Sequence, residues 1–237
     1  MMNILYALSG AAIAVLSVFL LNKMPAKCFC DYDESPGEQH AAPRAGKWSL
    51  LICAAILATV FPVLLNQQGL RLGSVFSCLV CAVLLMIALS DLRFCIIPDE
   101  LIIVGCLFAT VSVFPAILTG HEWSARLAPV LGAAVGAGII YVINLLGRIL
   151  YKKEALGMGD LKLMVVCGII SGPVGTVIAM LISILAASIL FAAGIAAKKI
   201  QSESYLPLGP FLVFGTIFTL AFRPMIDAFL AWYISLI

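Results

Sequence analysis

The stretch Gly157-Met158-Gly159-Asp160-Leu161-Lys162-Leu163 places an aspartate at the start of an apolar segment, directly behind two glycines. A carboxylate there is costly, because a medium of low dielectric constant penalises its charged form. An ionisable residue at a membrane edge therefore indicates a functional site, for which a partner must be identified. The candidate partner is Asp91, which ends another apolar segment in Ser90-Asp91-Leu92-Arg93-Phe94-Cys95-Ile96-Ile97-Pro98-Asp99.

The composition places both aspartates in a membrane protein. Of 237 residues, 63% are hydrophobic and only 11% are charged, whereas a soluble domain is about 45–50% apolar and about 25% charged. We therefore expect an all-α, polytopic membrane helical bundle of about eight transmembrane helices, which forms a single integral membrane domain over residues 1–237. No basic run is interleaved with aromatic residues, so the sequence does not favour binding to nucleic acid. The expected spans are about 4–22, 48–66, 74–90, 98–119, 127–150, 161–172, 174–197 and a last one from 209, which Arg223-Pro224 interrupts.

The positive residues predict the orientation of this bundle. If the polar loop 23–47 is cytoplasmic, most of the 14 Lys and Arg residues lie on that side, and only Arg71, Arg126 and Arg223 lie on the other. Both termini are then outside, and the loops 91–99 and 151–162 face the cytoplasm. Asp91 and Asp160 are two crossings apart, so the parity of the crossings puts them at the same face. The spacing alone does not say whether they touch.

Two carboxylates held close together share one proton, because both cannot ionise cheaply. This is the arrangement of aspartic proteases, in which one carboxylate takes a proton from water and the other donates one to the scissile carbonyl. A structural interpretation stays open for each residue. Asp91 or Asp160 could simply cap a helix, Asp99 suits the positive end of a helix dipole, and Lys162 could only mark the cytoplasmic side.

Three patterns, in order, resemble the type IV prepilin leader peptidases, which are Gly-x-Gly-Asp intramembrane aspartyl proteases. The first is Asp91-Leu92-Arg93 with Ile97-Pro98-Asp99, and the second is the stretch 157–163. The third is Leu206-Pro207-Leu208-Gly209-Pro210-Phe211-Leu212, in which Leu208 replaces a phenylalanine of the family pattern. Together the patterns cover residues from about 75 to 220 in the spacing of the family.

The resemblance implies that Asp91 and Asp160 are the catalytic pair of a membrane-embedded endopeptidase. It implies as substrate a prepilin or pseudopilin, bound through its short basic leader and its first apolar helix and cut at the cytoplasmic face of the bacterial plasma membrane. The bilayer itself is the other expected partner. Residues expected to bind the substrate or shape the site are Pro98, Asp99, Gly157, Gly159, Lys162, Pro207, Gly209 and Pro210.

The first loop departs from the long form of this family, which carries two Cys-x-x-Cys pairs for zinc. Here the loop offers Cys28-Phe29-Cys30 and a distant His40, a poor set for a tetrahedral site. We therefore expect a short form with no metal and no cofactor. A loop of this length rarely folds without a metal or disulfides, so we also expect leader cleavage without N-methylation of the pilin. A bifunctional peptidase and N-methyltransferase is the alternative.

Two hypotheses from other classes remain. A proton- or ion-coupled transporter could use Asp91 and Asp160 as a relay. Transporter sites lie near the membrane midplane and usually come with internal repeats, whereas no repeat is visible here and both aspartates fall at the membrane edge. An inert assembly scaffold would leave two costly carboxylates unexplained.

Overall fold

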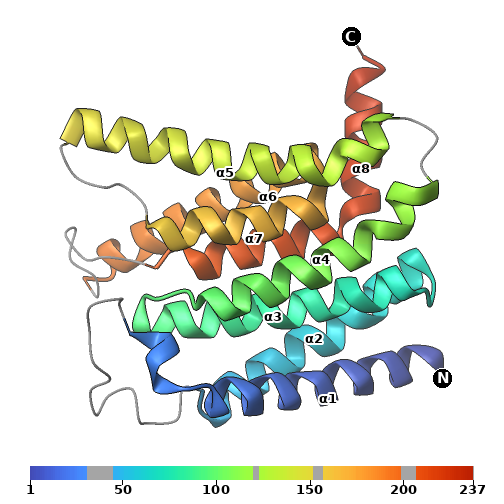
Figure 1. Ribbon diagram of the computed structural model, residues 1–237, viewed down its shortest axis with the longest axis horizontal. Helices are drawn as coiled ribbons and strands as arrows, with labels where there is room; N and C mark the ends of the chain where they lie inside the picture. Colours follow the sequence, from blue (N-terminus) through green and yellow to red (C-terminus); the bar gives the residue numbers. More distant parts are fainter. Residues whose placement is uncertain (31–44, 120–122, 152–156, 199–206, 237) are drawn as a thin grey trace.

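A computed structural model describes residues 1–30, 45–119, 123–151, 157–198 and 207–236 (Figure 1). Within these ranges the chain is helical and holds no strand, which confirms the all-α prediction. A 3-10 turn, η1 (Ala26–Phe29), follows the first helix. The α-helices are α1 (Met2–Lys23), α2 (Lys47–Gln68), α3 (Leu72–Phe94), α4 (Asp99–Thr119), α5 (Trp123–Tyr151), α6 (Met158–Ala196), α7 (Gly209–Ala221) and α8 (Arg223–Ile234).

The number of membrane spans is close to the expected eight. Among the described residues, six helices are long and apolar enough to cross a membrane, and α7 with α8 makes a seventh if that bent pair is one span. The protein is therefore a multi-pass membrane protein. The count is lower than expected because α6 contains both the sixth and the seventh predicted spans.

Helix α6 is broken at Gly172, as the Gly172-Pro173 pair predicts. Gly172 has φ 68° and ψ 176°, a conformation that is non-helical and open mainly to glycine. A Cβ built on Gly136 of α5 would lie 2.7 Å from the Met164 carbonyl oxygen and 3.1 Å from Thr176 Cγ2. A straight helix would separate Met164 from Thr176 by about 18 Å. Residues 158–171 and 173–196 therefore fold back on each other, and Figure 1 shows both ends of α6 at the same end of the bundle.

The fold-back is joined to the corner between α7 and α8. These two helices meet at an angle of 76°, and no residue of α8 is buried. Arg223 at the corner donates from a terminal guanidinium nitrogen to the Ser171 carbonyl oxygen at 2.9 Å. Gln67 at the end of α2 donates to the Ala221 carbonyl oxygen at 2.6 Å. The chain after Arg223 therefore does not continue the line of α7, which the sequence left undecided.

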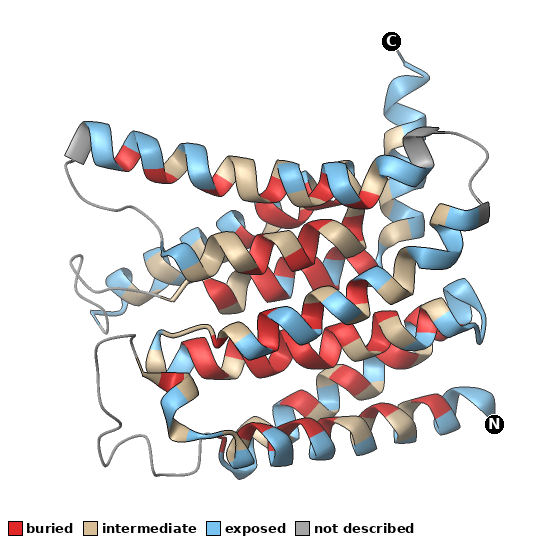
Figure 2. Ribbon diagram, viewed as in Figure 1, coloured by how far each residue is buried: buried red, intermediate tan, exposed pale blue. Residues whose placement is uncertain are grey.

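Helix α3 forms the centre of the bundle (Figure 2). Of its most apolar window, 67% is buried, whereas none of the other five single-helix spans exceeds 33%. The outer helices expose many large apolar side chains, which is expected where lipid covers the surface. The last buried residue of α3 is Asp91, so the central helix carries this carboxylate into the packed interior.

The small residues of α5 allow the backbones of α5 and α6 to touch. A Cβ on Gly132 would lie 2.8 Å from the Gly172 Cα, and one on Gly168 would lie 2.6 Å from the Ala133 nitrogen. No larger side chain fits at either position. This confirms the close helix approach that the small-residue spacing predicts, and it fixes the first part of α6, which carries Asp160, against α5.

Candidate active site

Asp91 lies in the last turn of α3 and is only 5% exposed. The backbone N–H of Gly209 donates to its Oδ2 at 3.0 Å. Gly209 is the first residue of α7, so this N–H belongs to the start of a helix, where backbone donors lack a partner within the helix. The Asp91 carboxylate thus accepts a hydrogen bond from the positive end of the α7 dipole.

Asp160 has a similar setting at the start of α6. Gly157 is the N-cap of that helix and Asp160 is its third residue, half-buried. A Cβ built on Gly157 would lie 3.8 Å from Asp160 Oδ2, so the carboxyl group lies against the N-cap of its own helix, near the positive end of the α6 dipole. The charge of Asp91 also acts on Asp160. The structure therefore brings together the two aspartates that sequence parity put at one face.

Gly209 also has a steric role at the site. A Cβ at this position would lie 2.5 Å from Asp91 Oδ2 and 3.1 Å from Asp91 Cγ. Only glycine lets the backbone of α7 approach the carboxylate this closely. Pro210 follows in the first turn of α7, where a proline suits the helix because its missing N–H would be unpaired anyway.

The turn from α3 to α4 is fixed by its own hydrogen bonds. Cys95 ends α3 in the left-handed region at φ 53° and ψ 32°, and its N–H donates to the Asp91 carbonyl oxygen at 2.9 Å. The buried Ser90 hydroxyl donates to the Ile96 carbonyl oxygen at 2.7 Å. Buried Pro98 comes directly before α4, and its carbonyl oxygen accepts from the N–H of Leu101. This turn therefore holds the end of α3 in one orientation.

The same turn contacts the start of α6. A Cβ on Gly159 would lie 3.2 Å from Ile97 Cβ and 3.3 Å from its Cδ1, a spacing tight enough that any side chain would push Ile97 away. Lys162 Nζ donates to both carboxylate oxygens of Asp99, at 2.7 and 2.9 Å. Asp99 does lie in the first turn of α4, as predicted. The sequence did not predict that Asp99 pairs with Lys162, because the two residues are 63 positions apart and no pattern in the sequence links them.

A segment that the site predictions left out also packs here. The Phe29 and Phe94 rings have centroids 5.3 Å apart, and Phe29 is fully buried. The Cys28 thiol donates to Glu100 Oε1 at 3.3 Å. The beginning of the first loop therefore lies against the turn that follows Asp91. Residues 31–44 of that loop, including His40, lie outside the described residues.

Two of the residues predicted to shape the site, Pro207 and Gly157, are placed differently from the others. Pro207 lines a small hollow together with Phe191 and Phe211, and neither aspartate is part of that hollow. Gly157 is exposed, although its N–H faces Asp160. Among the residues that the structure describes, no three His, Cys, Asp or Glu side chains group closely enough to hold a metal ion.

The comparisons with known proteins agree with the predicted resemblance. Residues 78–192 match the type IV leader peptidase family, a segment that contains both aspartates. The chain is 27% identical over 192 residues to a protein of Bacillus subtilis (strain 168) described as a prepilin leader peptidase/N-methyltransferase. That match covers 79% of this chain and 71% of the relative. No solved structure matches.

Proposed function

Because residues 78–192 match the type IV leader peptidase family, we propose that the chain is an aspartic endopeptidase that cleaves the leader of a type IV prepilin or pseudopilin. The catalytic pair is Asp91 and Asp160. One observation carries the proposal: two carboxylates from distant parts of the chain lie near enough to interact at one end of the bundle, and each lies against the start of a helix, α7 for Asp91 and α6 for Asp160.

The geometry supports a mechanism in which the two carboxylates transfer protons and the backbone orients them. With one proton shared by the pair, the ionised carboxylate removes a proton from the attacking water. The protonated carboxylate donates its proton to the carbonyl oxygen of the scissile bond. As the tetrahedral intermediate collapses, the first carboxylate gives the proton taken from water to the leaving amine, and the second takes a proton back from a hydroxyl group of the intermediate. The N–H group of Gly209 holds the Asp91 carboxylate in place, so the orientation of this member of the pair is set before substrate binds.

The proposed setting is the cytoplasmic face of the bacterial plasma membrane. It follows from the distribution of Lys and Arg along the sequence, in which only Arg71, Arg126 and Arg223 fall on the opposite side of the expected spans. The ion-relay alternative has less support, because the match over residues 78–192 is to a peptidase family. That the chain cleaves without methylating stays a prediction, since it rests on a loop whose residues 31–44 are not described.

The test is leader cleavage by purified protein in detergent, followed on a gel with a tagged prepilin. Asp91→Asn and Asp160→Asn should each abolish cleavage and leave the elution volume and thermal midpoint nearly unchanged, because asparagine keeps the shape of the side chain but cannot exchange a proton. Asp227→Asn is the matched control, since Asp227 lies on α8 and forms its ion pair with Arg223 of the same helix. Substantial cleavage by either site variant would remove that residue from the catalytic pair.

A further inference from the structure

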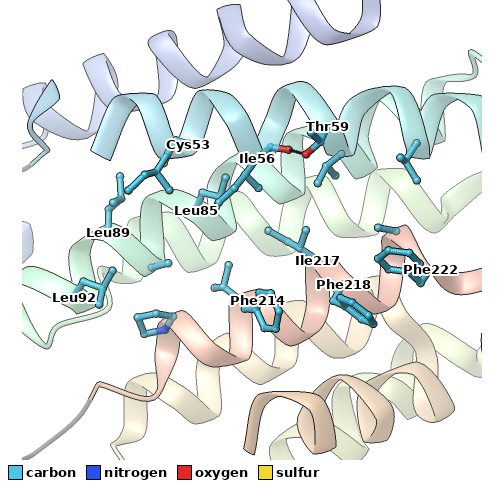
Figure 3. A pocket seen from close by; sticks show the side chains of 17 residues that line it. Cys53, Ile56, Thr59, Leu85, Leu89, Leu92, Phe214, Ile217, Phe218 and Phe222 are labelled. Carbon is cyan, nitrogen blue, oxygen red and sulfur yellow. Dashed lines mark hydrogen bonds between the residues drawn. The ribbon is translucent and has the colours of Figure 1, made fainter. Parts of the chain in front are cut away.

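An apolar groove of about 470 Å³ lies between α2, α3 and α7 (Figure 3). One end is lined by Leu92 and Pro210, which follow Asp91 and Gly209 directly in the chain. The other end is lined by Phe222. The groove therefore begins beside the carboxylate that α3 carries and runs along the bundle toward its opposite end.

The lining has the repeat of a helix face. Helix α7 contributes positions that repeat at spacings of three and four, and Phe222 follows at its end. They are Pro210, Val213, Phe214, Ile217, Phe218 and Ala221. This stripe covers about 18 Å of α7 at 1.5 Å per residue. Helices α2 and α3 line the groove with the same spacing. An elongated trough with helical walls fits a partner that is itself a helix.

The groove offers its occupant almost nothing polar. Among its lining side chains the one hydroxyl belongs to Thr59, which donates to the Ala55 and Ile56 carbonyl oxygens of its own helix at 3.1 and 2.8 Å. Large apolar side chains along it are open to the membrane, with Ile52 60% and Phe214 51% exposed. An occupant must therefore be apolar along its length and make its own backbone hydrogen bonds.

The two ends of the groove differ. At the far end, Gln67 of α2 donates to the Ala221 carbonyl oxygen of α7, so these helices are tied together there. Among the residues that the structure describes, no hydrogen bond joins α2 to α7 at the end near Asp91. A segment whose first residues lie at the carboxylates can therefore extend along the groove as far as the hydrogen bond between Gln67 and Ala221.

We propose that the groove holds the apolar helix of the same substrate whose leader junction lies between Asp91 and Asp160, an inference that rests on the proposed function. Once the scissile bond lies at the pair, the residues that follow it leave the site beside Leu92 and Pro210. These two residues are already part of the groove. The continuity of the groove with the carboxylates favours a peptide helix over a lipid chain, since a lipid chain would need no such connection.

The first experiment fills the groove. Val63→Trp and Phe214→Trp add bulk to two opposite walls, and Leu107→Trp on α4 is the control, because Leu107 is 60% exposed outside the groove. Each variant is assayed with the whole prepilin and with a short peptide that spans the leader junction but lacks the apolar helix. We expect kcat/KM for the whole prepilin to fall about tenfold in the two groove variants, the effect of blocking a packed contact, with cleavage of the short peptide and the control variant unchanged.

Other outcomes separate the groove from the proposed function. Equal losses on both substrates, or no loss on either, would overturn the groove as a binding site and leave the peptidase in place. If the unmodified protein cleaves neither substrate, the proposed function fails.

The second experiment does not need cleavage. In an Asp91→Asn background, a photo-reactive benzoylphenylalanine replaces Phe214 or, as a control, Leu107. A cross-link from position 214 to the apolar helix of the prepilin, with none from position 107, is the expected result. Cross-links only to lipid, or equal cross-links from both positions, would overturn the proposal.

Discussion

At the residue scale, Gly209 couples the geometry of a helix to that of a carboxylate. Its N–H bonds to Asp91, and the space where its side chain would be is filled by the same carboxylate. Sequence reasoning selected Gly209 from its motif but could not say what lies against it. The structure shows why a glycine is needed here: the Asp91 carboxylate occupies the space that a Cβ would fill. A substitution at Gly209 should therefore act on Asp91 and not only on the backbone conformation.

Gly209→Ala should lower leader cleavage by about 100-fold, the loss expected when a reacting group moves by about 1 Å. The added methyl group would otherwise lie 2.5 Å from Asp91 Oδ2, so the carboxylate must turn away. The measurement is kcat/KM for prepilin cleavage, with Gly138→Ala as control because nothing lies within 4 Å of a Cβ there. Equal activity of the two variants would show that the position of Asp91 does not depend on Gly209.

The Asp99–Lys162 pair is a different kind of contact, because its side chains are 43% and 40% exposed. Water screens such a pair, so its contribution to stability is at most about 1 kcal/mol. Asp99→Asn should therefore reduce cleavage less than about tenfold, and the double exchange Asp99→Lys with Lys162→Asp should restore most of what either single change loses. Complete loss of cleavage in Asp99→Asn, with folding intact, would instead give Asp99 a direct part in the chemistry.

At the scale of elements, the sequence predicted where the helices lie more accurately than how they are joined. Long apolar runs ended by polar residues determined α1 to α5 to within a few residues, and Gly172-Pro173 marked the break inside α6. The contacts that secure the break were not predictable, because Arg223 is 52 residues away from Ser171. The 76° corner after α7 was likewise left open by an apolar tail that suits either a span or an interface.

Arg223→Ala should destabilise the fold-back of α6. The Ser171 carbonyl oxygen would lose the donor that lies at 2.9 Å, and a buried acceptor without a partner costs about 1–3 kcal/mol. The measurement is the midpoint of thermal unfolding in detergent. Asp227→Asn is the control, because it removes the ion pair with Arg223 and keeps the guanidinium near Ser171. If both variants unfold at the same temperature, the bond to Ser171 contributes nothing measurable.

At the scale of the whole molecule, the membrane placement could be predicted and the lateral arrangement could not. Counting crossings put Asp91 and Asp160 at one end, which the structure confirms. Which helices lie side by side could not be predicted, because side chains that face lipid and side chains that face another helix are equally apolar. The groove between α2, α3 and α7 was missed for that reason: its walls resemble any other lipid-facing surface in the sequence.

The orientation of the bundle gives a prediction for intact cells. Cys95 is exposed at the end of the bundle near Asp91, and Gln68 ends α2 at the opposite end. In a protein that keeps only Cys95, a membrane-impermeant thiol reagent should react after lysis but not with whole cells. With all native cysteines removed and Gln68→Cys added, the reagent should label whole cells. The reverse pattern would put the carboxylates on the side away from newly made pilins.

The fold-back at Gly172 also affects the bilayer around the enzyme. Residues 158–171 reach about 21 Å from Gly172, and residues 173–196 reach about 36 Å, at 1.5 Å per residue. The hydrocarbon core of a membrane is about 30 Å thick, so the two arms differ in hydrophobic length by half that thickness. A membrane adjusts to such a mismatch by thinning beside the shorter segment. Since Asp160 lies at the start of the shorter arm, we expect such thinning to bring bulk water closer to the depth of this carboxylate.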